Sequence, residues 1–293
     1  MEIQIVEFFK SWSCKFCDLL FSFTNILGED LFFYLVFFIL YWCYDRRFAL
    51  KYSLVYLGSC ASNVLLKKLI GRPRPIGATA TGKSFPSGHA QSYASVGTGL
   101  LYEANKHKFP AKRWQRIEFL IEFIVFGVLV AIGRMYFGQH YLTDVVAGLL
   151  IGAIITILIT YVVDIIISKS KISLDKFLLI LVPIVAVAYV VVACTNIFDA
   201  PDDLAKIYRM VGIFFSVVVG HFVDKKWIKY SCEDTMKNRL LKAVFGSATL
   251  MMIFSLWLRE VEVNALLPVY YFVVGLVGTV VLPWIFKTIK NEG

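Results

Sequence analysis

The sequence predicts an all-α protein, a polytopic bundle of about eight or nine transmembrane helices. Hydrophobic residues make up 58% of the 293-residue chain and charged residues only 17%, and the mean hydropathy is +0.70. Three charge-free runs, residues 145–163, 177–198 and 263–286, approach or exceed the roughly 20 residues that cross a bilayer. This composition excludes an ordinary soluble globular domain.

The predicted spans follow one another with short connections. Apolar density and helical spacing place them near residues 30–45, 48–68, 87–104, 118–137, 143–167, 176–197, 207–223, 240–258 and 265–286.

The segment before these spans, residues 3–27, also has apolar residues at helical spacing, but four charged residues interrupt it. Charges are costly at the centre of a bilayer, which favours a helix lying at the interface and leaves a true crossing as the alternative. We therefore divide the chain into an amphipathic N-terminal helix (1–28), a membrane-embedded core (29–167) and additional C-terminal spans (168–293).

No cleavage site typical of a signal peptide is present in residues 1–27, so we expect no signal peptide.

The positions of lysine and arginine predict the topology. If the spans alternate, one side of the membrane carries the basic loops, which lie at residues 46–51, 106–116, 169–176, 225–242 and 287–290. The other side carries acidic turns, at Glu29-Asp30, Asp199 to Asp203, and Glu260 with Glu262. Because basic loops face the cytoplasm, we expect a cytoplasmic C-terminus. These loops also explain the net charge of +9, and no nucleic-acid-binding pattern accompanies it, so we expect no nucleic-acid partner.

The cysteines and two of the histidines suggest no chemistry. Cys14-x2-Cys17 has the spacing of a metal-binding pair but no second pair, so we expect no zinc there. His107 and His221 have no acidic partner at helical spacing, and we expect neither to take part in a site.

Three short polar stretches interrupt the apolar pattern on the predicted non-cytoplasmic side. The first is Lys67-x6-Arg74-Pro75. Its prolines end the preceding helix and place Arg74 on a rigid non-helical segment. A basic stop at a membrane boundary is the alternative interpretation, but such clusters are under-represented on this side.

The second stretch is Pro86-Ser87-Gly88-His89. Serine is a favoured helix N-cap, and Gly88 and His89 would then open the helix with N–H groups that can bind an anion. His89, in the first turn, is placed to protonate a departing oxygen. An ordinary helix cap is the alternative.

The third stretch is Arg134-x5-His140-x3-Asp144. His140 and Asp144 are four residues apart and share one helix face, so the carboxylate can hold one ring nitrogen and leave the other as a nucleophile. Arg134 can clamp a phosphate, or alternatively extend to lipid headgroups. Each stretch alone has a structural explanation, whereas the three in this order supply the cations, imidazoles and carboxylate that suit a phosphate dianion.

The three stretches resemble the signature of the type-2 phosphatidic acid phosphatase superfamily, or lipid phosphate phosphatases, which shares its site with glucose-6-phosphatase and vanadium haloperoxidases. The resemblance covers residues 30–167 and implies a haloperoxidase-like helical core. It also implies that His140 attacks phosphorus to form a phosphohistidine, that Asp144 orients it, and that His89 protonates the leaving group. The residues that would hold the phosphate oxygens are Lys67, Arg74, Ser87, Gly88 and Arg134. The resemblance implies no metal and no other cofactor.

One residue departs from the family pattern, since the third motif usually begins Ser-Arg and here Gly133 precedes Arg134. A basic loop, Asp45-Arg46-Arg47, and extra C-terminal spans are also similar to sphingosine-phosphate phosphatases. We expect a metal-independent phosphatase of a lipid phosphate monoester or of a polyprenyl (pyro)phosphate, surrounded by membrane lipids, with its site on the non-cytoplasmic side. The sequence predicts no particular oligomeric state.

Three alternatives remain. The substrate could be a soluble sugar phosphate, or the chain could be a non-catalytic lipid-binding or transport protein. A serine hydrolase built on Ser87 is disfavoured because no G-x-S-x-G sequence is present.

Overall fold

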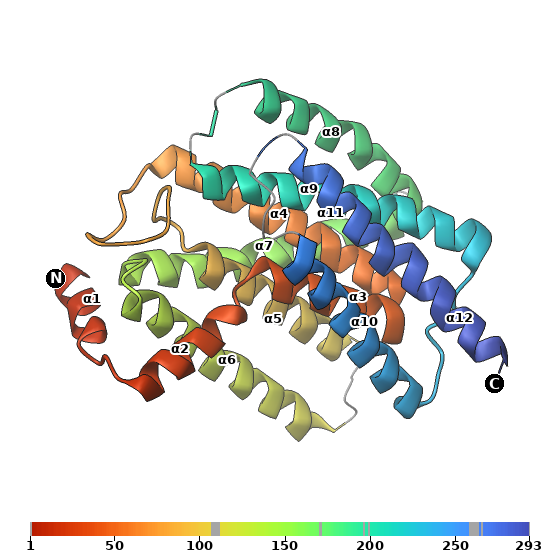
Figure 1. Ribbon diagram of the computed structural model, residues 1–293, viewed down its shortest axis with the longest axis horizontal. Coiled ribbons are helices and arrows are strands. Elements are labelled where there is room, and N and C mark those ends of the chain that lie inside the picture. Colours follow the sequence, from red (N-terminus) through yellow and green to blue (C-terminus); the bar gives the residue numbers. More distant parts are fainter. Residues whose placement is uncertain are drawn as a thin grey trace. The chain divides into compact units, whose positions relative to one another are not determined.

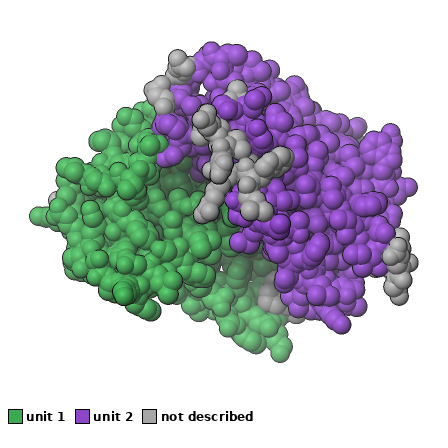
Figure 2. Space-filling view, viewed as in Figure 1, with its two compact units in different colours: residues 1–34, 54–164 green, residues 35–53, 165–293 purple. Residues whose placement is uncertain are grey.

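The structure is a computed structural model that describes residues 2–106, 112–169, 172–195, 197–198, 200–257, 264 and 266–292. All regular secondary structure in these residues is helical (Figure 1), so the all-α prediction is confirmed. The chain divides into two compact units (Figure 2): residues 1–34 with 54–164 form unit 1, and residues 35–53 with 165–293 form unit 2. Several residues used in the topology prediction lie outside the described residues, namely Lys108, Lys171, Asp199, Glu260 and Glu262, and so does His107.

Unit 1 contains the three polar stretches. Its complete helices are α1 (Glu2–Lys10), α2 (Lys15–Ile26), α5 (Gly88–Lys106) and α6 (Arg113–Tyr136). It also holds the start of α3 (Asp30–Cys43) and most of α4 (Arg46–Ile70) and α7 (Leu142–Lys169). Helix α6 packs against α1, α2 and α5, so the N-terminal segment lies directly on the helix that carries Arg134.

Two glycines allow α7 to approach α5 closely. A Cβ added at Gly148 would lie 2.6 Å from the carbonyl oxygen of Ser87, and one at Gly152 would lie 2.3 Å from that of Gln91. Any larger residue would force the two helices apart. The close approach fixes the start of α5, with the second motif, against the start of α7, with part of the third.

Buried polar side chains attach α4 to the same place. Asn63 of α4 donates hydrogen bonds to the Oε1 of Gln91 at 2.9 Å and to the carbonyl oxygen of Pro86 at 3.3 Å. Gln91 in turn donates to the carbonyl oxygen of Ser59 at 2.8 Å. Because unpaired polar groups are costly inside a helical bundle, this network holds the end of α4, which carries Lys67, beside the second motif.

Unit 2 contains α8 (Leu174–Cys194), α9 (Pro201–Val223), α10 (Met236–Trp257), α11 (Leu267–Leu276) and α12 (Leu282–Glu292). Short π-helical segments, η1 (Asp224–Ile228) and η2 (Val277–Val281), continue α9 and α11. Small residues let α9 and α11 pack closely: a Cβ at Gly212 would meet the carbonyl oxygen of Pro268 at 2.3 Å. The interaction resembles the small-residue contacts found between membrane helices.

Several charged side chains in unit 2 occur in pairs. Arg46 is paired with Asp224, and Lys242 lies 2.6 Å from Asp234. His221 lies 2.8 Å from Asp175, which sequence spacing could not indicate because the two residues belong to different helices.

Four segments are long and apolar enough to cross a membrane, namely Leu142–Lys169, Leu174–Cys194, Pro201–Ile228 and Leu267–Ile289. The pair α2 and α3, bent by 52° at their junction, would be a fifth span if it crosses as one unit. These four or five helices among the described residues support a multi-pass membrane protein, with fewer spans meeting the criterion than the eight or nine predicted.

Candidate active site

His140 and Asp144 lie at the junction between α6 and α7, and both side chains are almost fully buried. The Nδ1 of His140 lies 3.6 Å from the Oδ2 of Asp144, slightly beyond hydrogen-bond distance, and this nitrogen has no hydrogen-bond partner. The backbone N–H of Tyr141 donates to the same Oδ2 at 2.9 Å, which fixes the carboxylate below the ring. A small movement would therefore complete the histidine–carboxylate pair.

Arg74 of the first motif approaches the opposite edge of the imidazole. Its Nη1 lies 3.2 Å from the Nε2 of His140 and donates to the carbonyl oxygen of Gln139 at 3.0 Å. Its Nε and Nη2 both donate to the carbonyl oxygen of Thr81, at 3.1 and 3.0 Å. The guanidinium is thus held by neutral acceptors beside the nitrogen that would act as nucleophile.

The electrostatic surroundings of His140 show that the three motifs converge. Burial lowers the pKa of His140 well below its usual value, and the charges of Arg134, Arg74, Lys67 and His89 lower it further. Lys67 is itself buried in the last turn of α4. A cation-rich, desolvated site keeps the imidazole neutral at pH 7, which is the form that can attack phosphorus.

The second motif forms another side of the site. The N–H of Ser87 donates to the carbonyl oxygen of Asp144 at 2.9 Å, and α5 begins at the next residue, Gly88. The hydroxyl of Ser87 is fully buried and has no hydrogen-bond partner. His89, in the first turn of α5, places its Nε2 2.9 Å from the Oε1 of Glu29.

Arg134 lies in the last turn of α6 and is also buried. Its Nη1 donates to the side-chain oxygen of Asn25, while its Nε has no hydrogen-bond partner. Buried donors without partners are uncommon in folded proteins, and a bound ligand is one of the groups that can pair with them. The Nε of Arg134 and the hydroxyl of Ser87 are two such donors, and both belong to the predicted phosphate-binding set.

Arg72 has a role that the sequence reasoning missed. It donates to the Oδ1 of Asp144 at 2.8 Å and to the hydroxyl of Thr143 at 2.6 Å, and its guanidinium lies 4.2 Å from the centre of the Tyr141 ring. The K-x6-R-P spacing selects Arg74 and leaves Arg72 as a neighbouring basic residue. The repeated Arg-Pro in residues 72–75 was the only local signal.

Three residues near the start of the chain were also missed. Glu2 pairs with Arg72 and accepts a hydrogen bond from the hydroxyl of Thr143 at 2.6 Å. Asn25 and Glu29 contact Arg134 and His89, as described above. No pattern in the sequence indicates these contacts, because each joins positions at least 60 residues apart.

Gly133, the departure from the family pattern, faces α2. A Cβ added there would lie 3.4 Å from the hydroxyl oxygen of Thr24 and 3.5 Å from the Cβ of Phe21, which is ordinary van der Waals contact. A serine hydroxyl at this position would therefore meet α2. The contact that Gly133 lacks is with that helix, to which Arg134 is already joined through Asn25.

The structure assigns no metal site among the residues it describes, since no group of three or more His, Cys, Asp or Glu side chains there could hold an ion. Cys14 and Cys17 have a local structural role. The Sγ of Cys14 accepts a hydrogen bond from the N–H of Cys17 at 3.2 Å and caps the start of α2.

Comparison with known families gives two matches. Residues 48–168 match the PAP2 superfamily, and residues 208–293 match the family described as PAP2 superfamily phosphatase, transmembrane extension.

The chain is also similar to curated proteins. It is 34% identical to phosphatidylglycerophosphatase B of Bacillus subtilis (strain 168) over 100 residues, which are 33% of this chain and 49% of that protein. It is 30% identical to a probable sphingosine-1-phosphate phosphatase of Dictyostelium discoideum over 175 residues, 54% of this chain and 41% of that protein. With sphingosine-1-phosphate phosphatase 1 of Rattus norvegicus it shares 32% identity, over 50% of this chain and 35% of that protein. The matches thus span less than half the length of each of these relatives.

Two solved structures are similar to parts of this chain. One is the PAP2 type phosphatidylglycerolphosphate phosphatase of Bacillus subtilis, with a TM-score of 0.49, 26% identity, and coverage of 56% of this chain and 84% of that chain. The other is Aquifex aeolicus LpxE, with a TM-score of 0.45, 18% identity, and coverage of 55% of this chain and 94% of that chain.

Proposed function

Because the chain belongs to the PAP2 superfamily, we propose that it is a membrane phosphatase that hydrolyses a lipid phosphate through a phosphohistidine on His140. The observation that carries the proposal is that residues of all three motifs meet at the buried imidazole of His140: Arg74 contacts its Nε2, Asp144 lies beside its Nδ1, and Ser87 donates to the backbone of Asp144. The names of the relatives, a phosphatidylglycerophosphatase and sphingosine-1-phosphate phosphatases, support a lipid phosphate as the substrate class.

The reaction would take place in two steps. In the first, the Nε2 of His140 forms a bond to phosphorus, the bond from phosphorus to the alkoxide breaks, and His89 gives its proton to the departing oxygen. In the second, water attacks phosphorus, the phosphorus–nitrogen bond breaks, and His89 takes the proton of the water. Asp144 would accept a hydrogen bond from the N–H of Nδ1 as positive charge develops on the ring. This bond would shorten the present 3.6 Å separation between the two side chains.

The cations would stabilise the charge that develops on the phosphoryl oxygens. Arg74 already contacts His140, and an arriving phosphate would compete with His140 for its Nη1 and leave the Nε2 lone pair available. Lys67, Arg134, the hydroxyl of Ser87 and the N–H of Gly88 would hold the remaining positions. Preorganised donors in a water-poor site of this kind supply much of an enzyme's rate acceleration. This scheme needs no metal ion.

We further propose a chain of eight or nine spans with the site on the non-cytoplasmic side and the C-terminus in the cytoplasm. Helices α4, α5, α6 and α10 contain 25, 19, 24 and 22 residues, which at about 1.5 Å per residue gives each a length close to the thickness of a bilayer. They have fewer apolar residues than ordinary spans, and α4 and α5 bury polar groups against each other. The division into an N-terminal helix (1–28), a catalytic core (29–167) and C-terminal spans (168–293) belongs to the same proposal.

Labelling with a membrane-impermeant thiol reagent tests the orientation. In a chain without its native cysteines, Ala80→Cys, beside the site, should be labelled in intact cells, whereas Lys237→Cys should be labelled only after lysis. The reverse pattern would invert the topology.

The activity is tested by phosphate release from the detergent-purified protein. The panel should include phosphatidic acid, phosphatidylglycerophosphate, sphingosine-1-phosphate, a polyprenyl diphosphate and glucose 6-phosphate, each with a chelator present and with His140→Ala in parallel. We expect phosphate release from at least one lipid. Vanadate should inhibit this release, the chelator should not affect it, and His140→Ala should abolish it.

Three results would contradict this proposal. Release that persists in His140→Ala would exclude the phosphohistidine, and release from the sugar phosphate alone would establish the soluble-substrate alternative. If the folded protein releases phosphate from no substrate of the panel, a non-catalytic lipid-binding or transport role would be favoured.

A further inference from the structure

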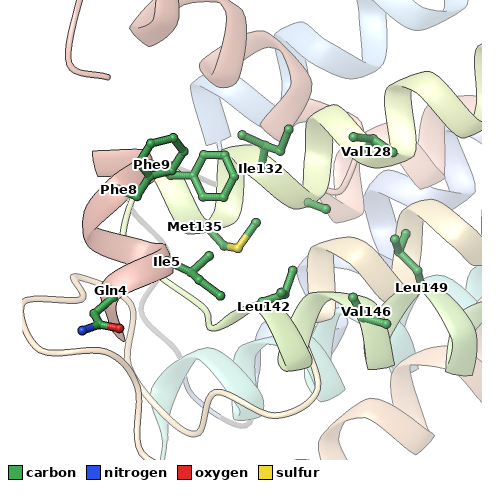
Figure 3. A pocket seen from close by; sticks show the side chains of 11 residues that line it. Gln4, Ile5, Phe8, Phe9, Val128, Ile132, Met135, Leu142, Val146 and Leu149 are labelled. Carbon is green, nitrogen blue, oxygen red and sulfur yellow. The ribbon is translucent and has the colours of Figure 1, made fainter. Parts of the chain in front are cut away.

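We propose that an apolar groove between α1, α6 and α7 binds the hydrocarbon chain of the substrate, which gives the site its selectivity for lipids; the inference rests on the proposed function. The groove has a volume of about 640 Å³, within the range of small-molecule sites, and all of its lining residues except Gln4 are apolar. Figure 3 shows side chains of α1, including Ile5 and Phe9, facing Met135 of α6 and Leu142 of α7 across it.

The groove shares its helices with the phosphate site. Its residues pack against a small buried core of three side chains, and each of these follows a site residue in the sequence. The consecutive pairs are His89–Ala90, Arg134–Met135 and Asp144–Val145. Ile5 and Phe9 of α1 cover this core. The groove and the site residues therefore occupy the same stretches of α6 and α7, joined through this core.

The first residue of α1 attaches that helix to polar residues beside the phosphate site. Glu2 contacts Arg72 and Thr143, and the apolar residues of the next two turns of α1 then line the groove. Along α6 the lining extends from Met135 back to Val128, and along α7 from Leu142 to Leu149. Seven residues of helix correspond to about 10 Å. The groove thus begins where the motifs lie and continues along both helices, as an alkyl chain attached to a bound phosphate would.

The composition of the groove indicates this occupant. A phosphate at one end and a hydrocarbon chain along the other match a cationic site with an apolar groove next to it, whereas a sugar phosphate has no part that such a groove could bind. The groove is also open at its side, since the side chains of Phe8, Val128 and Val146 are about half exposed. A chain could therefore enter sideways from the surrounding lipid.

The groove contributes orientation more than affinity. A lipid chain already lies in an apolar environment, so transfer into the groove gains little from the hydrophobic effect, and packing contacts decide how well it fits. A chain held in one place aligns the phosphate with His140, and misplacement by a small distance reduces the rate strongly. Filling the groove should therefore lower turnover of long-chain substrates specifically.

A matched pair of variants on α6 tests this prediction. Val128 lines the groove and Val125 does not, and both side chains are 50% exposed. We expect Val128→Trp to lower the ratio of activity on dipalmitoyl phosphatidic acid to activity on dibutyryl phosphatidic acid at least about tenfold. Val125→Trp should leave the ratio unchanged. An equal loss on both substrates in Val128→Trp, or the same change in Val125→Trp, would overturn the proposal.

Crosslinking separates this inference from the proposed function. A long-chain alkyl phosphate with a diazirine in its chain should label α1 and α6 of the wild-type protein, and Val128→Trp should remove that labelling. This holds even if no substrate is hydrolysed, in which case only the proposed function fails. Labelling spread over the lipid-facing helices, α8 included, or equal labelling by a diazirine phosphatidylcholine, would overturn the groove as a substrate site.

Discussion

The two units bury their charged side chains in different ways. In unit 2, two of the buried or half-buried cations meet carboxylates, in the pairs Arg46–Asp224 and Lys242–Asp234. In unit 1, Arg134 donates to the neutral amide of Asn25 and leaves its Nε without a partner, and Arg74 donates to backbone carbonyl oxygens.

The difference indicates separate roles for the two sets of charges, in stability for unit 2 and in phosphate binding for unit 1. A buried cation is costly unless an anion compensates it, and in unit 2 the fold supplies that anion. In unit 1 the cations converge on an imidazole, and a bound phosphate would supply the compensation. We therefore expect substitutions at the unit 2 pairs to change stability, and substitutions at the unit 1 cluster to change turnover.

The largest expected effect is at His140. His140→Asn should reduce phosphate release at least about a thousandfold, because the variant retains a polar side chain but has no nucleophilic nitrogen. The melting temperature should change by no more than a few degrees, measured in the same detergent. A variant that keeps a tenth of the activity would show that another residue forms the covalent bond.

Asp224 provides the reciprocal test in unit 2. Asp224→Asn leaves Arg46 without its carboxylate at a fully buried position, and we expect the free energy of unfolding to fall by about 3–5 kcal/mol. Turnover per folded molecule should stay unchanged. Asp175→Asn is the control: its side chain is 24% exposed, and loss of such a partly exposed pair should cost about 1 kcal/mol or less. A fall in turnover without loss of stability in Asp224→Asn would remove the distinction between the units.

The helical class could be predicted from hydropathy alone, whereas the number of spans could not be established in this way. Helices α4 and α5 bury polar residues such as Asn63 and Gln91 against each other, so their sequences are less apolar than those of α7 or α8. Hydropathy measures how well a helix suits lipid, and a helix that faces mainly other helices is free to carry polar groups.

The order and spacing of the three motifs were sufficient to nominate the residues that the structure brings around His140. The second set of site residues, Glu2, Asn25 and Glu29, could not be found in this way. Each acts on a motif residue that is far away in the sequence and lies on another helix, and only the packing of α1 and α2 on α6 brings them together. Of these three residues only Asn25 lies within residues 3–27, the segment whose charges disfavour a membrane crossing.

Arg72 tests whether a charge pair inside unit 1 serves the chemistry. Arg72→Lys keeps the positive charge but loses the planar group that reaches both Asp144 and Thr143, so the carboxylate below His140 is less well fixed. We expect kcat to fall about ten- to a hundredfold with little change in KM. Lys83→Met, an exposed basic residue of the same loop, is the control and should have no effect. A rise in KM at constant kcat would make Arg72 a phosphate-binding residue instead.

The smallest expected effect is a shift in pH dependence. Burial and the neighbouring cations lower the pKa of His140 below the usual value of about 6.5, so the ring is neutral at pH 7 and turnover should fall only when the pH drops below that value. Removing the charge of Lys67 raises this pKa, so in Lys67→Met the acid limb of the rate profile should move up by a few tenths of a pH unit. Lys68→Met, at the exposed neighbouring position, should leave the limb in place.

The same pKa determines a contribution to stability with a defined sign. Below about pH 6.5 the unfolded histidine takes up a proton and the buried one does not, so this contribution is present above that pH and is lost as the pH falls toward the folded pKa. His140→Asn should therefore lose less stability than the wild-type protein between neutral and acidic pH.

In the comparison of rate profiles, the substrate is the same throughout, so its own ionisation cancels when Lys67→Met is compared with Lys68→Met. Identical acid limbs in these two variants would show that Lys67 does not act on the nucleophile, and that the cations of unit 1 are less closely coupled than their burial indicates.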